Sequence, residues 1–165
     1  MLNRALDRIE DGLAVVAAAL IAFSVLAVTI DVGSRYFMNR PLPWVFEVTE
    51  YILLFVPCLG MAWLARNDGH VVIDIVTGKL SAPVRARLAA IVSLVVAAIC
   101  FFIAWWGWIA TRESYAARAV IENILQTPQF AIYAAIPFGF FLCGVEFVRK
   151  SWRAWHGVLP AAATH

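Results

Sequence analysis

Four long apolar stretches dominate the pattern of hydrophobic and polar positions along the chain. Residues 12–30 and 88–111 contain no charged side chain, and residues 44–65 carry charge only in their first turns. The fourth stretch covers about 128–147 and is uncharged as far as Val145. An apolar run of about 18 residues or more is long enough to cross the hydrocarbon core as a helix. The pattern therefore predicts an all-α membrane protein whose four transmembrane helices form a single domain over residues 1–165.

Two flanking segments show the repeat of an amphipathic helix. One precedes the first apolar stretch and the other lies between the third and the fourth. Their apolar side chains fall on one helical face: Leu2, Leu6, Ile9 and Leu13 in the first segment, and Ala117, Val120, Ile121 and Ile124 in the second. We expect short interfacial helices here, which either lie on the membrane surface or pack on a partner.

Composition agrees with a membrane protein and excludes other classes. The 165 residues are 63% hydrophobic and 15% charged, with a mean hydropathy of +0.82. A soluble domain is about a quarter charged, and a disordered chain is less hydrophobic still. The net charge of +2 is too small to indicate a nucleic-acid partner. No loop is long enough for a soluble catalytic domain, so we expect no enzyme activity and no catalytic residue.

The distribution of basic residues predicts the orientation in the membrane. Nine of the thirteen lysines and arginines lie in the amino-terminal segment, the second loop and the carboxyl-terminal tail. The other four are Arg35 and Arg40 in the first loop and Arg112 and Arg118 in the third. Cytoplasmic loops carry the excess of basic residues, so both termini are expected in the cytoplasm. Tryptophans near the ends of the stretches, such as Trp44, are typical of residues at the membrane interface.

Cysteines and histidines offer no cofactor or metal site in this pattern. The three cysteines are far apart in apolar stretches, where they are expected in the core. No histidine lies inside an apolar stretch, which argues against axial haem ligands. His70 and Asp74 follow an Asn-Asp-Gly turn in the second loop, and without a third ligand nearby they favour a hydrogen-bonded turn over a metal site.

No Asp, Glu, Lys, Arg or His lies near the middle of any apolar stretch. Ion-coupled transport sites and proton relays usually need such a group at depth. The sequence therefore argues against a complete ion-coupled pump within this chain. The nearest candidates are Glu47 and Glu50, which share one helical face near the outer boundary. We expect them to pair with Arg35, Arg40 or Arg112, or else to contact a partner protein.

Two further local patterns predict helix contacts. Asp31 and Arg35 are four residues apart, which favours an ion pair if the first helix extends outward. Pro57 and Pro137 each remove a backbone donor inside a span and should kink it. The Pro137-Phe138-Gly139 step could instead allow close packing against another helix.

Taken in order along the chain, these features resemble the small membrane subunit of TRAP transporters, the DctQ-like family. The resemblance covers nearly the whole chain. The segments that carry it are 31–37 (DVGSRYF), 40–44 (RPLPW), Glu47 with 50–51 (EY), 60–62 (GMA), 69–71 (GHV) with Asp74, Pro128 at the start of the fourth span, and 136–140 (IPFGF). The segment 129–133 departs from the family pattern because it lacks a tryptophan.

The resemblance implies a tripartite, sodium-coupled transporter for organic acids in a bacterial inner membrane. A periplasmic substrate-binding protein captures the substrate and a large multi-span membrane subunit carries it with sodium. The small subunit would scaffold the large one, and its outer loops would help to dock the binding protein. The candidate contact residues are Asp31, Arg35, Tyr36, Arg40, Pro43, Trp44, Glu47, Glu50, His70, Asp74, Arg112, Arg118, Pro128, Pro137 and Gly139.

Three alternatives remain open at the level of sequence. The nearest is the small subunit of a tripartite tricarboxylate transporter, which has a similar accessory architecture. A membrane anchor for a redox complex is disfavoured by the lack of histidines within the spans. A stand-alone channel or exporter is disfavoured by the lack of buried charge.

Overall fold

A computed structural model describes residues 2–67 and 82–155. Its helices are α1 (Leu2–Met38), α2 (Pro43–Asn67), α4 (Ala82–Ala116), α5 (Gln129–Tyr133) and α6 (Ala135–Trp155). Four helical segments, the last made of α5 and α6 together, are long and apolar enough to cross a membrane. Within the described ranges no β-strand is present, apart from one isolated bridge between Val120 and Pro128. The predicted all-α architecture with four membrane-spanning helices is confirmed.

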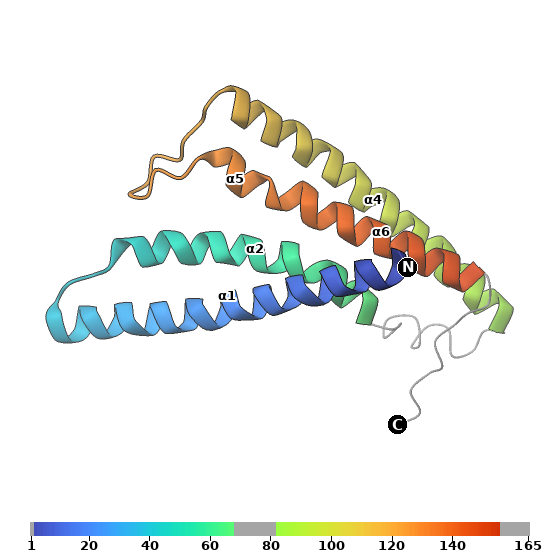
Figure 1. Ribbon diagram of the computed structural model, residues 1–165, viewed down its shortest axis with the longest axis horizontal. Coiled ribbons are helices and arrows are strands. Elements are labelled where there is room, and N and C mark those ends of the chain that lie inside the picture. Colours follow the sequence, from blue (N-terminus) through green and yellow to red (C-terminus); the bar gives the residue numbers. More distant parts are fainter. Residues whose placement is uncertain (1, 68–81, 156–165) are drawn as a thin grey trace.

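The helices form two antiparallel hairpins that lie against each other. The first hairpin is α1 with α2, and the second is α4 with α6 (Figure 1). The packing contacts of α2 are with α1 and α6, so the order across the bundle is α1, α2, α6, α4. We call the end that holds residues 38–43 and 117–128 the loop end. The opposite end, where α1 begins and α6 finishes, is the terminal end. The hairpins converge toward the terminal end and diverge toward the loop end (Figure 1).

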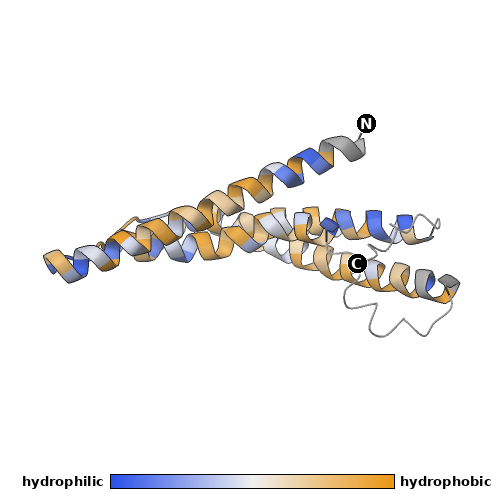
Figure 2. Cartoon of the chain, turned by 90° about the horizontal axis from the view of Figure 1, so that it is seen from below, coloured by the Kyte–Doolittle hydropathy of each residue, from blue (hydrophilic) through white to orange (hydrophobic). Residues whose placement is uncertain are grey.

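Small side chains fill the contacts between helices, and large ones face outward. Ala62 and Ala97 are each 1% exposed, whereas Val15 is 70% exposed and Phe102 is 65% exposed. Hydrophobic colour runs along the middle of the helices, and hydrophilic residues gather toward their ends (Figure 2). In a membrane, lipid replaces water around large apolar side chains, and small residues let helix backbones approach. This inside-out distribution is therefore the one expected of a bundle surrounded by lipid.

The flanking segments differ from the expected separate interfacial helices. The amino-terminal segment continues without a break into α1, which spans 37 residues. The segment after α4 does not form a helix, because the chain turns between Ala117 and Pro128. Arg118 and Gln126 adopt positive φ values of 48° and 45°, which an α-helix cannot contain. The apolar repeat in that segment is therefore not helical.

The fourth span is interrupted near its start. Pro128 has an extended conformation (φ −64°, ψ 122°) and caps α5, which begins at Gln129. The helix breaks at Ala134, and Pro137 lies in the first turn of α6. A proline there has no N–H for the carbonyl of Tyr133, and the next bond, from Phe138 N to Ala134 O, is long at 3.4 Å. The interruption expected from Pro137 is present.

Candidate interaction surfaces and the contacts that hold them

The turn between α1 and α2 is held by Asp31. One carboxylate oxygen pairs with Arg35 Nε at 2.9 Å, as the four-residue spacing predicted. The other accepts a hydrogen bond from the backbone N–H of Leu42 at 2.7 Å. Ser34 Oγ donates to the carbonyl of Arg40 at 2.7 Å, and Asn39 takes the positive φ of 51° that reverses the chain. These contacts fix the start of α2 relative to the last turns of α1.

Exposed aromatic side chains surround this turn. Tyr36 and Phe37 are each 84% exposed, and their rings meet edge-on at 5.2 Å between centroids. Trp44 is 41% exposed and follows Pro43, the first residue of α2. The turn therefore presents aromatic surface beside its charges, a combination that is common where proteins contact lipid headgroups or a partner.

Glu47 pairs with no arginine in the part of the chain that the structure describes, which corrects the expectation from sequence. Its side chain is buried near the start of α2, and its carboxylate accepts two backbone hydrogen bonds from the loop between α4 and α5. Ile124 N donates to one oxygen at 2.7 Å and Leu125 N donates to the other at 3.0 Å. Charge-assisted bonds of this kind are stronger than neutral ones. Glu47 thus ties the second hairpin to the first at the loop end.

The loop that Glu47 holds is an ordered hairpin. Gln129 N donates to Ala119 O at 3.0 Å, and Ile121 N donates to Thr127 O at 3.1 Å. Its apolar side chains Val120 and Ile124 are 51% and 66% exposed. A loop fixed before binding loses less conformational entropy when a partner docks. The loop end therefore offers a pre-organised surface.

Replacing Glu47 with alanine should free this loop. Two charge-assisted bonds are lost, and each is worth about 1.5–3 kcal/mol. We expect hydrogen exchange at the Ile124 and Leu125 amides to accelerate at least about tenfold. Mass spectrometry of the detergent-solubilised chain measures this exchange, with Glu113→Ala as the control, because Glu113 is exposed and its side chain bonds to no described residue. Unchanged exchange at both amides would contradict the assigned role of Glu47.

Three arginines at the loop end are exposed without an ion pair to any described residue. They are Arg40, Arg112 and Arg118. Glu50, which was expected to pair with an arginine, is also exposed on α2, and no ion pair joins it to the rest of residues 2–67 and 82–155. The two glutamates of α2 therefore differ in their surroundings: Glu47 is buried and hydrogen-bonded, whereas Glu50 is exposed.

The two hairpins approach each other closely where α6 crosses α2. A Cβ built on Gly139 would lie 2.3 Å from the carbonyl oxygen of Cys58, far inside van der Waals contact. Cys58 follows Pro57, the proline inside α2. On the other side of α6, a Cβ on Gly144 would meet the ring of Phe101 in α4 at 3.1 Å. The close packing that the Pro-Phe-Gly step suggested is present, with α2 as the neighbour.

A network of ion pairs joins α1, α2 and α6 at the terminal end. Glu146 is fully buried, with one oxygen 2.7 Å from Arg149 and the other 2.5 Å from Arg153. Arg149 also binds the Asp7 carboxylate at 2.9 Å. From α2, Arg66 donates to the Asp7 carbonyl at 2.9 Å. The same guanidinium pairs with two further carboxylates of α1, those of Glu10 and Asp11.

Sequence reasoning did not identify this network as a contact between helices. The amino-terminal segment was expected to lie on the membrane surface or to pack on a partner, but part of its polar face contacts α2 and α6. A signal existed, because Glu146, Arg149 and Arg153 are spaced three and seven residues apart and share a helical face.

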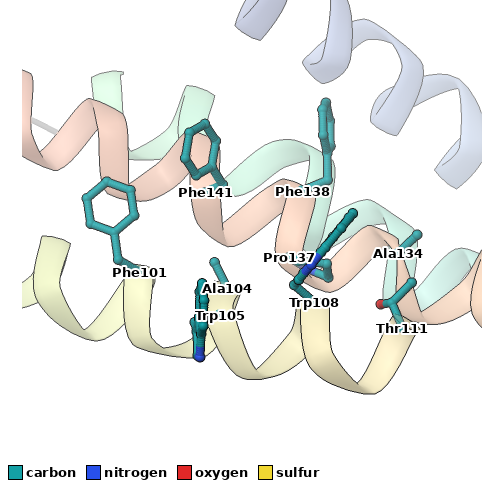
Figure 3. Close-up of a pocket in the computed structure, with 9 residues that line it drawn as sticks. All are labelled: Phe101, Ala104, Trp105, Trp108, Thr111, Ala134, Pro137, Phe138 and Phe141. Carbon is teal, nitrogen blue, oxygen red and sulfur yellow. The ribbon is translucent and has the colours of Figure 1, made fainter. Parts of the chain in front are cut away.

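An apolar groove runs between α4 and the first half of α6, with a volume of about 630 Å³. Its lining is shown in Figure 3: Phe101, Ala104, Trp105, Trp108, Thr111, Ala134, Pro137, Phe138 and Phe141. The hydroxyl of Thr111 donates to the Gly107 carbonyl at 2.7 Å and is thereby satisfied. The lining therefore offers apolar contact and holds no charged side chain that could bind an ion.

The structure brings together part of the predicted set of contact residues. Asp31, Arg35 and Pro43 form or flank one turn, Glu47 holds the neighbouring loop, and Gly139 lies at the crossing of α2 and α6. His70 and Asp74 lie outside the described residues. Among residues 2–67 and 82–155, no group of three or more His, Cys, Asp or Glu side chains could hold a metal ion.

Comparison with known proteins points to one family. A sequence model described as "Tripartite ATP-independent periplasmic transporters, DctQ component" matches residues 24–157. The match includes residues 24–38 of α1 and all of the remaining described helices.

Individual relatives agree with the family match. The ectoine TRAP transporter small permease protein TeaB of Halomonas elongata is 22% identical over 147 residues, covering 87% of this chain and 76% of its own length. The C4-dicarboxylate TRAP transporter small permease protein DctQ of Vibrio cholerae is 25% identical, with 85% and 71% covered. The sialic acid TRAP transporter small permease protein SiaQ of Vibrio cholerae is 27% identical, with 60% and 54% covered.

Proposed function

Since the chain belongs to the DctQ component family of tripartite ATP-independent periplasmic transporters, we propose that it scaffolds the large membrane subunit of such a transporter and helps to dock the periplasmic binding protein. The chain is a small permease subunit of the bacterial inner membrane, not an enzyme. Small permease subunits of this family work with a large membrane subunit and a periplasmic binding protein. This family membership takes the place of the three alternatives that the sequence left open: the small subunit of a tripartite tricarboxylate transporter, a membrane anchor for a redox complex, and a stand-alone channel or exporter.

The scaffolding role is supported by the sequence, which places no Asp, Glu, Lys, Arg or His near the middle of the four spans. A chain that carried substrate or ions itself would need polar groups at depth. Instead, the bundle is braced at three levels: Glu47 at the loop end, Gly139 at the crossing of α2 and α6, and Glu146 at the terminal end. A bundle tied in this way suits a fixed support against which another subunit moves.

The docking role is supported by the surface at the loop end. The excess of basic residues elsewhere in the sequence predicts that this end faces the periplasm. It presents Arg40, Arg112 and Arg118, which form no ion pair with the described residues, together with the partly exposed Trp44 and the ordered loop with exposed Ile124. Exposed charges steer association, and aromatic side chains anchor it.

The substrate and the coupling ion are also part of the proposal. The relatives transport ectoine, sialic acid and C4-dicarboxylates, according to their names. We infer sodium-driven uptake of a small organic acid, with the substrate and sodium sites on the large subunit.

Reversing the charge of Arg118 should weaken docking. For the reconstituted transporter with Arg118→Glu, we expect the binding-protein concentration that gives half-maximal uptake to rise about fivefold, with maximal uptake retained. The matched control is Arg8→Glu, because Arg8 is exposed at the terminal end. A titration of uptake against binding protein measures both values. If the Arg118 variant and the wild type gave superimposable titrations, the docking role would be wrong.

A further inference from the structure

The exposed face of α2 carries a row of residues that lie four, three, seven and four positions apart along the helix. We call this row, Phe46, Glu50, Leu53, Gly60 and Leu64, the α2 stripe; such spacing places its members on one helical face. Phe46 is 73% exposed, Leu53 is 76% exposed and Leu64 is 52% exposed. A Cβ built on Gly60 would meet nothing within 4 Å. Within the described bundle, this face therefore has no neighbour.

Two contacts fix how deeply Glu50 lies in the membrane. Near the loop end, Asp31 of α1 binds the N–H of Leu42, just before α2 begins. Near the terminal end, Arg66 of α2 binds the carbonyl of Asp7 in α1. Leu42 is thus level with Asp31, and Arg66 is level with Asp7. Both intervals are 24 residues long, so the two antiparallel helices stay in register between these points. In this register Glu50 lies level with Phe23.

That level lies inside the hydrocarbon core of the membrane. The uncharged stretch of α1 spans residues 12–30, which at 1.5 Å per residue matches the roughly 30 Å thickness of the hydrocarbon core. Phe23 is seven residues from its outer end, a depth of about 10 Å. Glu50 is thus an exposed carboxylate about a third of the way into the bilayer. Charged side chains at such depth are costly and usually face a protein partner.

We propose that the α2 stripe is the surface that docks against a membrane-spanning helix of the large subunit, with Glu50 paired to a lysine or arginine of that helix. This inference rests on the proposed function. Lipid tails cannot satisfy a carboxylate, and the soluble binding protein does not reach this depth. A second copy of this chain, packed by the same face about a two-fold axis, would set one Glu50 against the other and repel. Gly60 leaves room for the partner's backbone to approach.

The sign of the effect of Glu50→Leu separates a lipid-facing residue from a partner-facing one. A carboxylate that faces lipid destabilises the bundle in the membrane. Its replacement by leucine would therefore leave recovery of the large subunit unchanged or raise it. If Glu50 is paired, its removal leaves the partner's cation unpaired in hydrocarbon. Recovery of the large subunit should then fall at least about tenfold. The test is co-purification of the complete transporter from native membranes with the small subunit tagged. Glu113→Leu is the matched control, because Glu113 is exposed near the end of α4.

A crosslink decides the case if Glu50→Leu disturbs folding. Leu53 is replaced by the photocrosslinking residue p-benzoylphenylalanine in the otherwise wild-type transporter, and its adducts are identified by mass spectrometry. The proposal expects an adduct with the large subunit. Adducts with lipid alone, or with a second copy of this chain, would overturn it even if the wild-type small subunit still recovers the large one. If the wild-type small subunit recovers no large subunit, the proposed function fails as well.

Discussion

Replacing Gly139 with alanine is expected to lower the free energy of unfolding by about 3 kcal/mol, toward the upper end of overpacking costs. The added Cβ would lie 2.3 Å from the Cys58 carbonyl oxygen, and the obstacle is backbone rather than a flexible side chain. The helices α2 and α6 must separate, and the small neighbouring side chains cannot fill the gap. The midpoint of thermal unfolding in detergent should fall by about 6–12 °C.

Gly33→Ala is the matched control for this prediction. Gly33 lies in α1, and a Cβ built there would meet nothing within 4 Å. Alanine favours a helix over glycine by about 1 kcal/mol, so the midpoint for this variant should stay level or rise. If the two alanine variants unfolded at the same temperature, Gly139 would not be the contact point of the hairpins.

Replacing Glu146 with glutamine is expected to cost about 3 kcal/mol, because it breaks a buried ion pair from one side. The carboxylate is fully buried and is the shared partner of Arg149 and Arg153. Among the described residues, its loss leaves Arg149 paired with Asp7 only and Arg153 without an ion-pair partner. We expect the thermal midpoint to fall by about 6–12 °C.

Glu113→Gln makes the same chemical change on an exposed site and should alter the free energy of unfolding by less than about 0.5 kcal/mol. A Glu146 variant as stable as this control would mean that the network at the terminal end contributes little to holding α1, α2 and α6 together. Limited proteolysis of the amino-terminal turns of α1 gives a second readout, since Asp7 is tethered through Arg149.

The four spans could be predicted because each depends only on a long apolar stretch. The boundaries could not, since α1 continues to Leu2 and α4 starts at Ala82, through polar residues that the hydropathy pattern excludes. The Asp31–Arg35 pair was also predictable, because both residues lie on one helix and their spacing alone brings them together.

Contacts between distant segments were harder to predict. Glu47 was expected to pair with an arginine, but it accepts hydrogen bonds from backbone N–H groups some 77 residues away in the sequence. The loop that supplies them has an apolar repeat that resembles a helix, but the positive φ of Arg118 and Gln126 and the backbone hydrogen bonds across the loop show that it turns. Nearly every residue has a backbone N–H, so a sequence pattern does not indicate which of them will act as a donor. The partner of Glu47 was missed for this reason.

The buried state of Glu146 was missed for a related reason. A carboxylate near the end of a span is expected at the membrane surface, and only the return of α1 and α6 to the same end surrounds it with protein. Helix order cannot be read from apolar faces when lipid-facing and protein-facing sides are both apolar. The ion pairs reveal that order only once the fold is known.

Whether this chain is an accessory subunit is tested by recovering the tagged chain from native membranes in mild detergent, with its partners identified and quantified by mass spectrometry. An accessory subunit predicts a large multi-span membrane protein in comparable molar amount, together with sodium-dependent uptake that appears only when both subunits and the binding protein are reconstituted. Recovery of the chain alone, even after crosslinking, together with substrate flux through liposomes that contain only this chain, would show that it is not an accessory subunit.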